Sequence, residues 1–217
     1  MRNLLIYGGT FDPIHNGHIN TAINVQNYFN FDRFIFLPCK IPVLKNKAIA
    51  TAAQRIDMIN LALLQQDKDK HFALDLSEIN RDSPSYMVDS LQNFRDELGD
   101  KIAITLLMGA DTFNQLPHWH AWHRLLTLAN ILVIKRPGFN EAQTPSLENL
   151  LDKHETEDKN ALCQQAQGVI YRYDAGSFNF SSSWIRKQFA EGKTPQGYLP
   201  EPVLQYIKQN NLYFKLY

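Results

Sequence analysis

The chain has 217 residues, of which 44% are hydrophobic, so it can bury the core of one domain or of one domain with an appendage. Lysine plus arginine (22) equals aspartate plus glutamate (22), which argues against a broad basic face for nucleic acid, so any phosphate binding must be local. Two cysteines, no apolar run near the ~18 residues of a bilayer span and no signal-peptide pattern predict a cytoplasmic protein without disulfides or a membrane partner.

The N-terminal segment predicts a strand, a turn and a helix. Residues 4–7, Leu-Leu-Ile-Tyr, read as a buried strand, and apolar residues over 19–29 recur at helical spacing. Between them lies Gly8-Gly9-Thr10-Phe11-Asp12-Pro13-Ile14-His15-Asn16-Gly17-His18. The two glycines let the backbone approach a bulky ligand, and a helix entrance attracts anions. His15 and His18 lie on one side of that entrance and can both donate hydrogen bonds to phosphate, so we predict a nucleotide site.

A second strand is predicted at 33–37, which makes a parallel strand–helix–strand crossover with the first. The loop over 38–50 carries Lys40 and Lys45, which are either solvated or contact an anionic substrate. Thr51-Ala52-Ala53-Gln54 is a capping-box pattern that opens a helix. The apolar face expected for this helix consists of Ala52, Ile56, Ile59 and Leu63.

The middle of the chain predicts two more strands, at 72–76 and 102–108, with a helix over 86–98 between them. Ser85 is the expected N-cap of this helix, and Gly99 ends it. Gly109-Ala110-Asp111 follows the apolar strand 102–108, at the end of a parallel sheet where ligands bind. Asp111 either accepts a hydrogen bond from a ribose hydroxyl or only caps the next helix.

The segment 118–123, His-Trp-His-Ala-Trp-His, lacks the carboxylate or cysteine that would complete a metal site. Trp119 either packs a helix entrance or stacks on a flat ligand ring. Strands are predicted at 131–134 and 169–173, with a polar surface insertion over about 140–168 between them. Ser181-Ser182-Ser183 then opens a helix with Arg186 one turn on, which makes either a second anion site or a plain serine cap. A last helix is expected over 201–210.

Six strands alternating with helices predict an α/β protein with a doubly wound, mostly parallel sheet. No Gly-x-Gly-x-x-Gly follows the first strand, which argues against a dehydrogenase-type dinucleotide site.

The motif over 8–18 resembles the signature of the nucleotidyltransferase superfamily, and its wording is similar to that of bacterial nicotinate mononucleotide adenylyltransferases. Further family elements occur in family order: Ser85-Tyr86, Gly109-x-Asp111, Trp119, Arg136-Pro137-Gly138, Ser181-Ser182-Ser183-x-Ile185-Arg186 and Leu199-Pro200-x-Pro202-Val203. The resemblance implies a Rossmann-like fold in a single domain over 1–217 with a C-terminal helical part from about 181 to 217. It implies adenylyl transfer from ATP to nicotinate mononucleotide, with Mg²⁺ carried by the ATP phosphates and no protein metal ligand.

Under this resemblance the expected site has three groups of residues. The catalytic residues are His15, His18 and Arg186. The ATP-binding residues are Gly8, Gly9, Thr10, Phe11, Gly17, Gly109, Asp111, Ser181, Ser182 and Ser183. The residues near the nicotinate nucleotide are Lys40, Lys45, Tyr86, Trp119 and Arg136.

The chain departs from the family pattern on the acceptor side. Val43 and Leu44 stand where the family has proline and histidine, and Met87 stands where it has threonine. These changes keep nicotinamide mononucleotide, or another phosphate acceptor, as an alternative substrate. A nucleotide-binding sensor without catalysis is the alternative of a different class, and the sequence leaves monomer and homo-oligomer both open.

Overall fold

The computed structural model describes residues 1–41, 48–64, 71–135, 144–176, 178 and 180–214. Its strands are β1 (Asn3–Gly9), β2 (Arg33–Pro38), β3 (Phe72–Leu74), β4 (Ala103–Gly109), β5 (Asn130–Ile134) and β6 (Ile170–Tyr173). Its α-helices are α1 (Asn16–Phe29), α2 (Ala52–Leu64), α3 (Ser77–Asn80), α4 (Met87–Leu98), α5 (Ala110–Asn114), α6 (Pro145–His154), α7 (Ala161–Gln164), α8 (Ser182–Ala190) and α9 (Glu201–Gln209). Two 3-10 helices, η1 (Leu116–His118) and η2 (Trp122–Thr127), follow α5.

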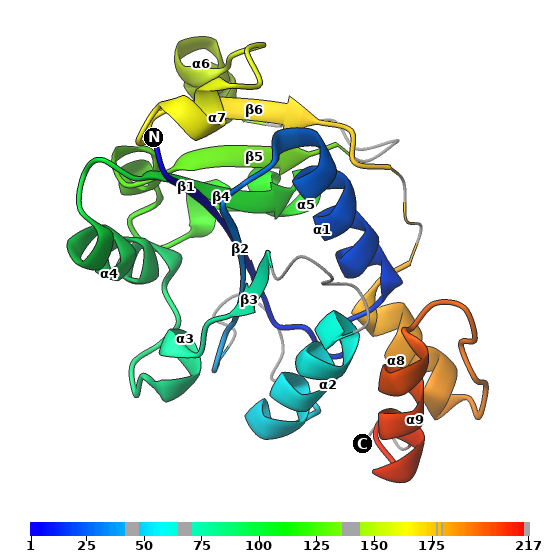
Figure 1. Cartoon of the computed structure of the whole chain (residues 1–217). Coiled ribbons are helices and arrows are strands. Elements are labelled where there is room, and N and C mark those ends of the chain that lie inside the picture. Colours follow the sequence, from blue (N-terminus) through cyan, green and yellow to red (C-terminus); the bar gives the residue numbers. More distant parts are fainter. Residues whose placement is uncertain (42–47, 65–70, 136–143, 177, 179, 215–217) are drawn as a thin grey trace.

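The six strands form one parallel sheet in the order β3-β2-β1-β4-β5-β6 (Figure 1). This confirms the predicted doubly wound α/β fold. The chain moves outward from β1 through β2 to β3, then returns to β4 on the other side of β1. The order therefore reverses between β1 and β4, and in open α/β sheets ligands bind at the carboxyl ends of the strands at such a switch point.

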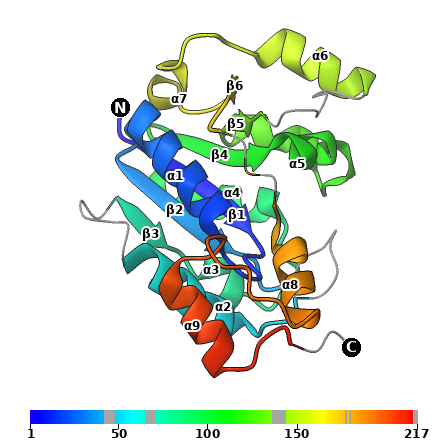
Figure 2. The same ribbon diagram turned by 90° about the vertical axis from the view of Figure 1, so that its right-hand side faces the viewer.

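Helices cover both faces of the sheet because the strands are apolar on both sides. Successive residues of β1 alternate between two buried clusters: Leu5 packs with one face, and Leu4 and Ile6 pack with the other. Figure 1 shows α1 and α4 on opposite sides of the sheet, and Figure 2 shows the same layers after a quarter turn. Helices α1, α2, α7, α8 and α9 contribute to the cluster with Leu5, and α4, α5 and α6 contribute to the other.

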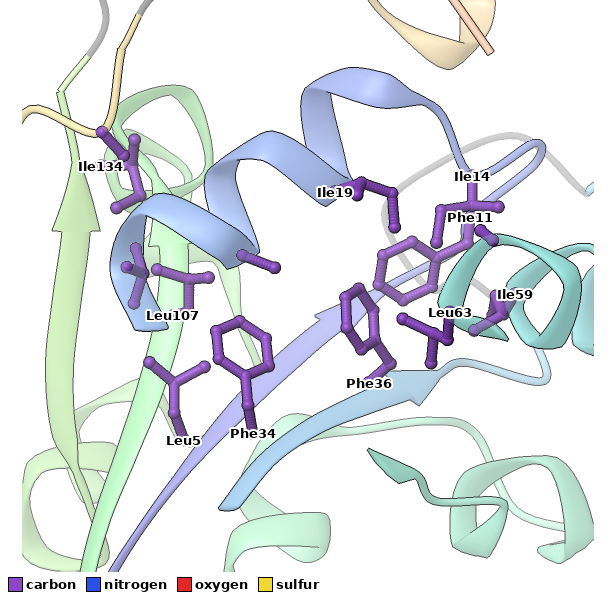
Figure 3. Packing of buried hydrophobic residues seen from close by; sticks show 14 of the residues in the cluster. Leu5, Phe11, Ile14, Ile19, Phe34, Phe36, Ile59, Leu63, Leu107 and Ile134 are labelled. Atoms are coloured by element: carbon purple, nitrogen blue, oxygen red, sulfur yellow. The ribbon is translucent and has the colours of Figure 1, made fainter. Parts of the chain in front are cut away.

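The buried cluster that contains Leu5 extends to the N-terminal turn. Phe11 and Ile14, which belong to this turn, are buried against Phe36 of β2 and Ile59 of α2 (Figure 3). The rings of Phe11 and Phe36 have centroids 5.7 Å apart. The turn is therefore packed as firmly as the strands that flank it, which gives the residues around it fixed positions.

The segment predicted as a surface insertion contains α6 and α7. Leu147 and Leu151 of α6, and Ala161 and Leu162 of α7, are buried, and the Leu162 carbonyl accepts a hydrogen bond from Thr105 of β4. These helices lie beside β6 in Figure 1. Residues 145–164 thus help to cover the sheet.

None of the helices in the described part of the chain combines the length and apolar character required to cross a lipid bilayer.

Candidate active site

The carboxyl ends of β1 and β4 lie side by side, because the two strands pair in parallel up to Tyr7 and Leu107. Gly8 and Gly9 end β1, and Gly109 ends β4 and caps α5. A Cβ on Gly109 would lie 2.6 Å from Oδ1 of Asp111, so the glycine leaves room for this carboxylate to fold back over the strand end. The predicted adenosine-side residues are therefore next to the predicted phosphate turn.

His15 and His18 form a reciprocal cap at the start of α1. Nδ1 of His15 accepts from the His18 backbone N–H at 3.3 Å, and Nδ1 of His18 accepts from the His15 backbone N–H at 3.3 Å. The two rings stack, with centroids 3.7 Å apart. Because each Nδ1 is an acceptor, the proton of each neutral ring belongs on Nε2. Both Nε2–H groups thus belong to rings at the positive end of a helix dipole.

Gly17 makes the stacking possible. A Cβ at this position would lie 3.0 Å from two atoms of the His15 ring and 3.3 Å from Cβ of Phe178. His15 is buried, whereas His18 is half-buried with its ring 5.1 Å from that of Phe11. Packing therefore fixes both imidazoles, which is a requirement for donors that stabilise developing charge.

The N-terminus of α8 meets the N-terminal turn. Ser181 caps α8 by accepting from the Trp184 N–H at 3.2 Å, and the Ser182 hydroxyl donates to the Pro13 carbonyl at 2.9 Å. Nη1 of Arg186 donates to the Asp12 carbonyl at 2.7 Å, and its Nη2 donates to the Ser183 hydroxyl at 3.2 Å. The structure thus brings both predicted anion sites, separated by more than half the chain, to one place.

The predicted acceptor-side residues follow β2 and precede α4. The Lys40 ammonium donates to the Arg81 carbonyl at 3.1 Å and to Asp82 at 2.9 Å, and this hydrogen bond lowers the pKa of Asp82. The Lys40 N–H donates to the Ser85 hydroxyl at 3.2 Å. The prediction that Ser85 is the N-cap of α4 is wrong. Tyr86 occupies that position, without a side-chain cap.

A buried carboxylate supports this acceptor side. Glu78 of α3 is 2% exposed and accepts from the Ser90 hydroxyl at 2.6 Å, with Ser85 as a further hydrogen-bond partner. Burial raises the pKa of Glu78, while Ser90 and Arg81 act in the opposite direction. Glu78 thus connects the loop that holds Lys40 to the body of α4.

Three aromatic or apolar side chains lie near these elements. The ring of Tyr86 lies 4.5 Å from that of His120, so Tyr86 is next to the segment that contains Trp119. Trp119 is half-buried against the core, directly after η1. The terminal methyl of Met87 reaches the end of β1, since a Cβ on Gly8 would be 2.6 Å away from it. Lys45, Arg136, Val43 and Leu44, on which other predictions fall, lie outside the described residues.

Arg55 of α2 is a residue that the sequence prediction missed. Its side chain is 1% exposed, and Nη1 donates to the carbonyls of Thr10 and Cys39, each at 2.8 Å. A further bond joins the Cys39 N–H to the Gly9 carbonyl at 3.0 Å. Arg55 therefore ties the N-terminal turn to the loop after β2. The sequence does hold a signal, because Arg55 is four residues before Ile59 on the buried face of its helix.

Comparisons with known proteins identify relatives of this chain. The family model described as cytidylyltransferase-like matches residues 6–188. A probable nicotinate-nucleotide adenylyltransferase from Legionella pneumophila (strain Lens) is 42% identical over 98% of this chain and 100% of its own length. Another from Methylococcus capsulatus is 38% identical over 97% of this chain and 99% of its own length. The chain belongs to the nicotinate-nucleotide adenylyltransferase family. It is a nucleotidyltransferase enzyme, and the adenylyl-transfer chemistry predicted from the N-terminal motif is confirmed.

A solved structure supports the fold of this adenylyltransferase. A nicotinic acid mononucleotide adenylyltransferase from Plasmodium falciparum, complexed with NaAD, superposes with a TM-score of 0.73. The two chains are 19% identical, and the match covers 100% of this chain and 99% of the other. At this identity the likeness shows a common Rossmann-like architecture.

Proposed function

We propose that this adenylyltransferase joins ATP and nicotinate mononucleotide to give deamido-NAD and pyrophosphate. The observation that carries the proposal is the meeting of α1 and α8 beside the end of β1. It places the imidazoles of His15 and His18 and the guanidinium of Arg186 around the segment Asp12–Pro13. The names of the relatives, and the NaAD bound to the Plasmodium enzyme, support nicotinate mononucleotide as the acceptor.

The reaction needs positioning and charge stabilisation more than acid–base chemistry. The phosphate of the acceptor is already anionic, so it attacks the α-phosphorus of ATP without a general base. A new phosphorus–oxygen bond forms on one side as the bond to the β-phosphate oxygen breaks on the other. The protein contributes by holding both reactants in line and by donating hydrogen bonds to the oxygens that gain charge.

The residues at the two helix starts have complementary roles in this proposal. His15 and His18 donate from Nε2 to oxygens of the α- and β-phosphates. Arg186 and the first backbone amides of α8, at Ser182 and Ser183, hold the departing pyrophosphate, because the first N–H groups of a helix have no partner within it. The N-terminal glycines let the triphosphate approach the backbone of the turn.

The remaining contacts follow from the ends of the strands and from the resemblance. Asp111, folded over Gly109, accepts from a ribose hydroxyl of the adenosine. Lys40, Tyr86 and Trp119 lie on the acceptor side, and Lys45 and Arg136 complete it. Among the residues that the structure describes, no three His, Cys, Asp or Glu side chains gather to hold a metal ion. Following the resemblance, we assign Mg²⁺ to the ATP phosphates, where it would neutralise charge, with few protein ligands.

Nicotinamide mononucleotide is the second candidate acceptor. The observation that favours it is Met87, an apolar side chain that lies against Gly8. The family has a threonine, with a hydroxyl group, at the position of Met87. A thioether cannot donate a hydrogen bond to the carboxylate of nicotinate, so this position does not select against the uncharged amide.

The test is the rate of pyrophosphate release from ATP and Mg²⁺ with each of the two nucleotides in parallel. Much faster release with nicotinate mononucleotide supports the proposal. Equal rates indicate that the substitutions on the acceptor side have relaxed the selection. Release with neither nucleotide contradicts the acceptor assignment, and a screen of other phosphate acceptors follows from that result.

A further inference from the structure

Tyr213, in the segment after α9, reaches back to the N-terminal turn. Its hydroxyl donates to Oδ1 of Asp12 at 2.7 Å, although the two residues are 201 positions apart. The side chain is 2% exposed, and its backbone is left-handed with a φ of 69°. Burial, with Asp12 as the next cause, raises the pKa of Tyr213 well above its ordinary value. The phenol therefore stays protonated and acts as a donor to Asp12.

Asp12 collects donors from three separate parts of the chain. Its Oδ2 accepts from the Ile49 N–H at 2.7 Å, and its Oδ1 accepts from the Ala50 N–H at 3.1 Å as well as from Tyr213. Nη1 of Arg186 lies 3.9 Å from Oδ2 and is bonded to the main-chain carbonyl of Asp12. The carboxylate is thus shared between neutral donors and a guanidinium at longer range.

A buried carboxylate attracts a nearby cation more strongly when it has fewer other hydrogen-bond donors. With Tyr213 present, three neutral donors occupy the carboxylate, and the guanidinium of Arg186 instead donates to the Asp12 carbonyl and to the Ser183 hydroxyl. Without the phenol, Oδ1 loses its shortest hydrogen bond, and the buried carboxylate gains by drawing a cation closer. The nearest cationic group to Asp12 in the described structure is Arg186, at 3.9 Å.

We propose that Tyr213 is a positioning residue for Arg186. By satisfying Asp12, it keeps the guanidinium at the start of α8, where it meets the pyrophosphate that leaves ATP. This inference rests on the proposed function only for the identity of that anion. Under this proposal the segment after α9 supports the phosphate site through Asp12.

The test compares Tyr213→Phe with Tyr206→Phe. Tyr206, in α9, makes an equivalent hydrogen bond of 2.8 Å to Asp57 of α2, but this bond is exposed and does not involve Asp12. Both changes remove one hydroxyl from a tyrosine that donates to an aspartate. Single-turnover pyrophosphate formation and the Kd of inorganic pyrophosphate, measured by calorimetry, are compared with the KM of the acceptor nucleotide.

We expect Tyr213→Phe to slow the single-turnover step and to weaken pyrophosphate binding, each by roughly 10- to 100-fold, as for a misplaced catalytic group. The acceptor KM should change by less than about 2-fold, and Tyr206→Phe should leave all three quantities near the parent values. Equal behaviour of the two variants, or a loss that falls on the acceptor KM, overturns the inference. Because pyrophosphate binding needs no acceptor, this readout remains valid if the acceptor assignment fails.

A double-mutant cycle separates positioning from a general loss of stability. If Tyr213 acts through Arg186, Tyr213→Phe adds almost nothing to the defect of Arg186→Lys, so the two effects are strongly non-additive. If Tyr213 contributes only to stability, the fold-losses of the two single variants multiply in the double variant, and that result overturns the inference. The cycle is measured below the melting temperature of every variant, so it decides the question even where Tyr213→Phe is less stable.

Discussion

His18 contributes both a phosphate donor and a helix cap, and the two contributions can be separated by substitution. His18→Ala removes Nε2, and we expect turnover to fall by roughly 10²–10³ as for the loss of a preorganised donor. It also removes the acceptor for the His15 N–H, which costs about 0.5–2 kcal/mol of stability. Steady-state kinetics and urea denaturation measure the two effects.

His18→Gln is the matched control. Glutamine at the third helical position accepts the same backbone N–H in a capping box, so it should restore stability. Its amide does not reproduce the imidazole donor, so turnover should stay well below that of the parent. Normal turnover in His18→Ala would show that His18 has no part in stabilising the transition state.

At the scale of single elements, the junction between β1 and the following turn depends on what surrounds each of the two glycines that end the strand. A Cβ at Gly9 would lie 2.9 Å from Cζ of Phe11, a buried ring that packs against Phe36 and His18. Among the residues that the structure describes, a Cβ at Gly8 meets only the terminal methyl of Met87, which can swing away. We expect Gly9→Ala to lose about 1–3 kcal/mol of stability and Gly8→Ala clearly less.

Chemical denaturation of the two alanine variants tests this order. Adding Met87→Ala to Gly8→Ala should recover most of the small loss, because it removes the colliding methyl. No such partner change should rescue Gly9→Ala, since Phe11 cannot be shortened without emptying a buried site. Equal losses at Gly8 and Gly9 would refute the account of the turn.

The elements themselves were largely predictable, because strands and long helices leave a periodic pattern of apolar residues. The prediction missed α3 and α7, since four residues are too few to show a period. It placed the N-cap of α4 at Ser85, whose hydroxyl instead accepts from Lys40, a partner 45 residues away. The carbonyls to which Arg55 donates, and the bond from Tyr213 to Asp12, likewise depend on distant segments. Local patterns locate the site residues but not the contacts that hold them.

For the whole molecule, one end of the sheet carries functional residues and the other end carries stabilising contacts. The carboxyl ends of β1 and β4 carry the candidate active site, whereas the opposite end is held together by Arg95 of α4. Its guanidinium donates to four backbone carbonyls, those of Gly99, Ile102, Leu128 and Ala166, at 2.6–3.0 Å. These carbonyls belong to the segments that enter β4, β5 and β6. One side chain therefore satisfies acceptors from the entrances of three strands.

Arg95→Met keeps the apolar stem but leaves these carbonyls without the donor. We expect a loss of about 3 kcal/mol in the free energy of unfolding, because the bond to the Leu128 carbonyl is buried and those to Gly99 and Ile102 are partly buried. The Ala166 carbonyl keeps the Ile104 N–H as a donor. Arg124→Met is the control, since Arg124 is exposed and makes a hydrogen bond of 3.0 Å to the Gln92 side chain. Its loss should be within about 0.5 kcal/mol of zero.

The kinetic part of this experiment decides whether the two ends are independent. At a temperature where Arg95→Met is fully folded, we expect its kcat and its KM for ATP to equal those of the parent, because every bond that it breaks lies at the far end of the sheet from Gly8, His18 and Arg186. A stability loss as small as that of Arg124→Met would contradict the role of Arg95. A fall in kcat in the folded variant would instead show that the strand entrances and the phosphate site are coupled through the sheet.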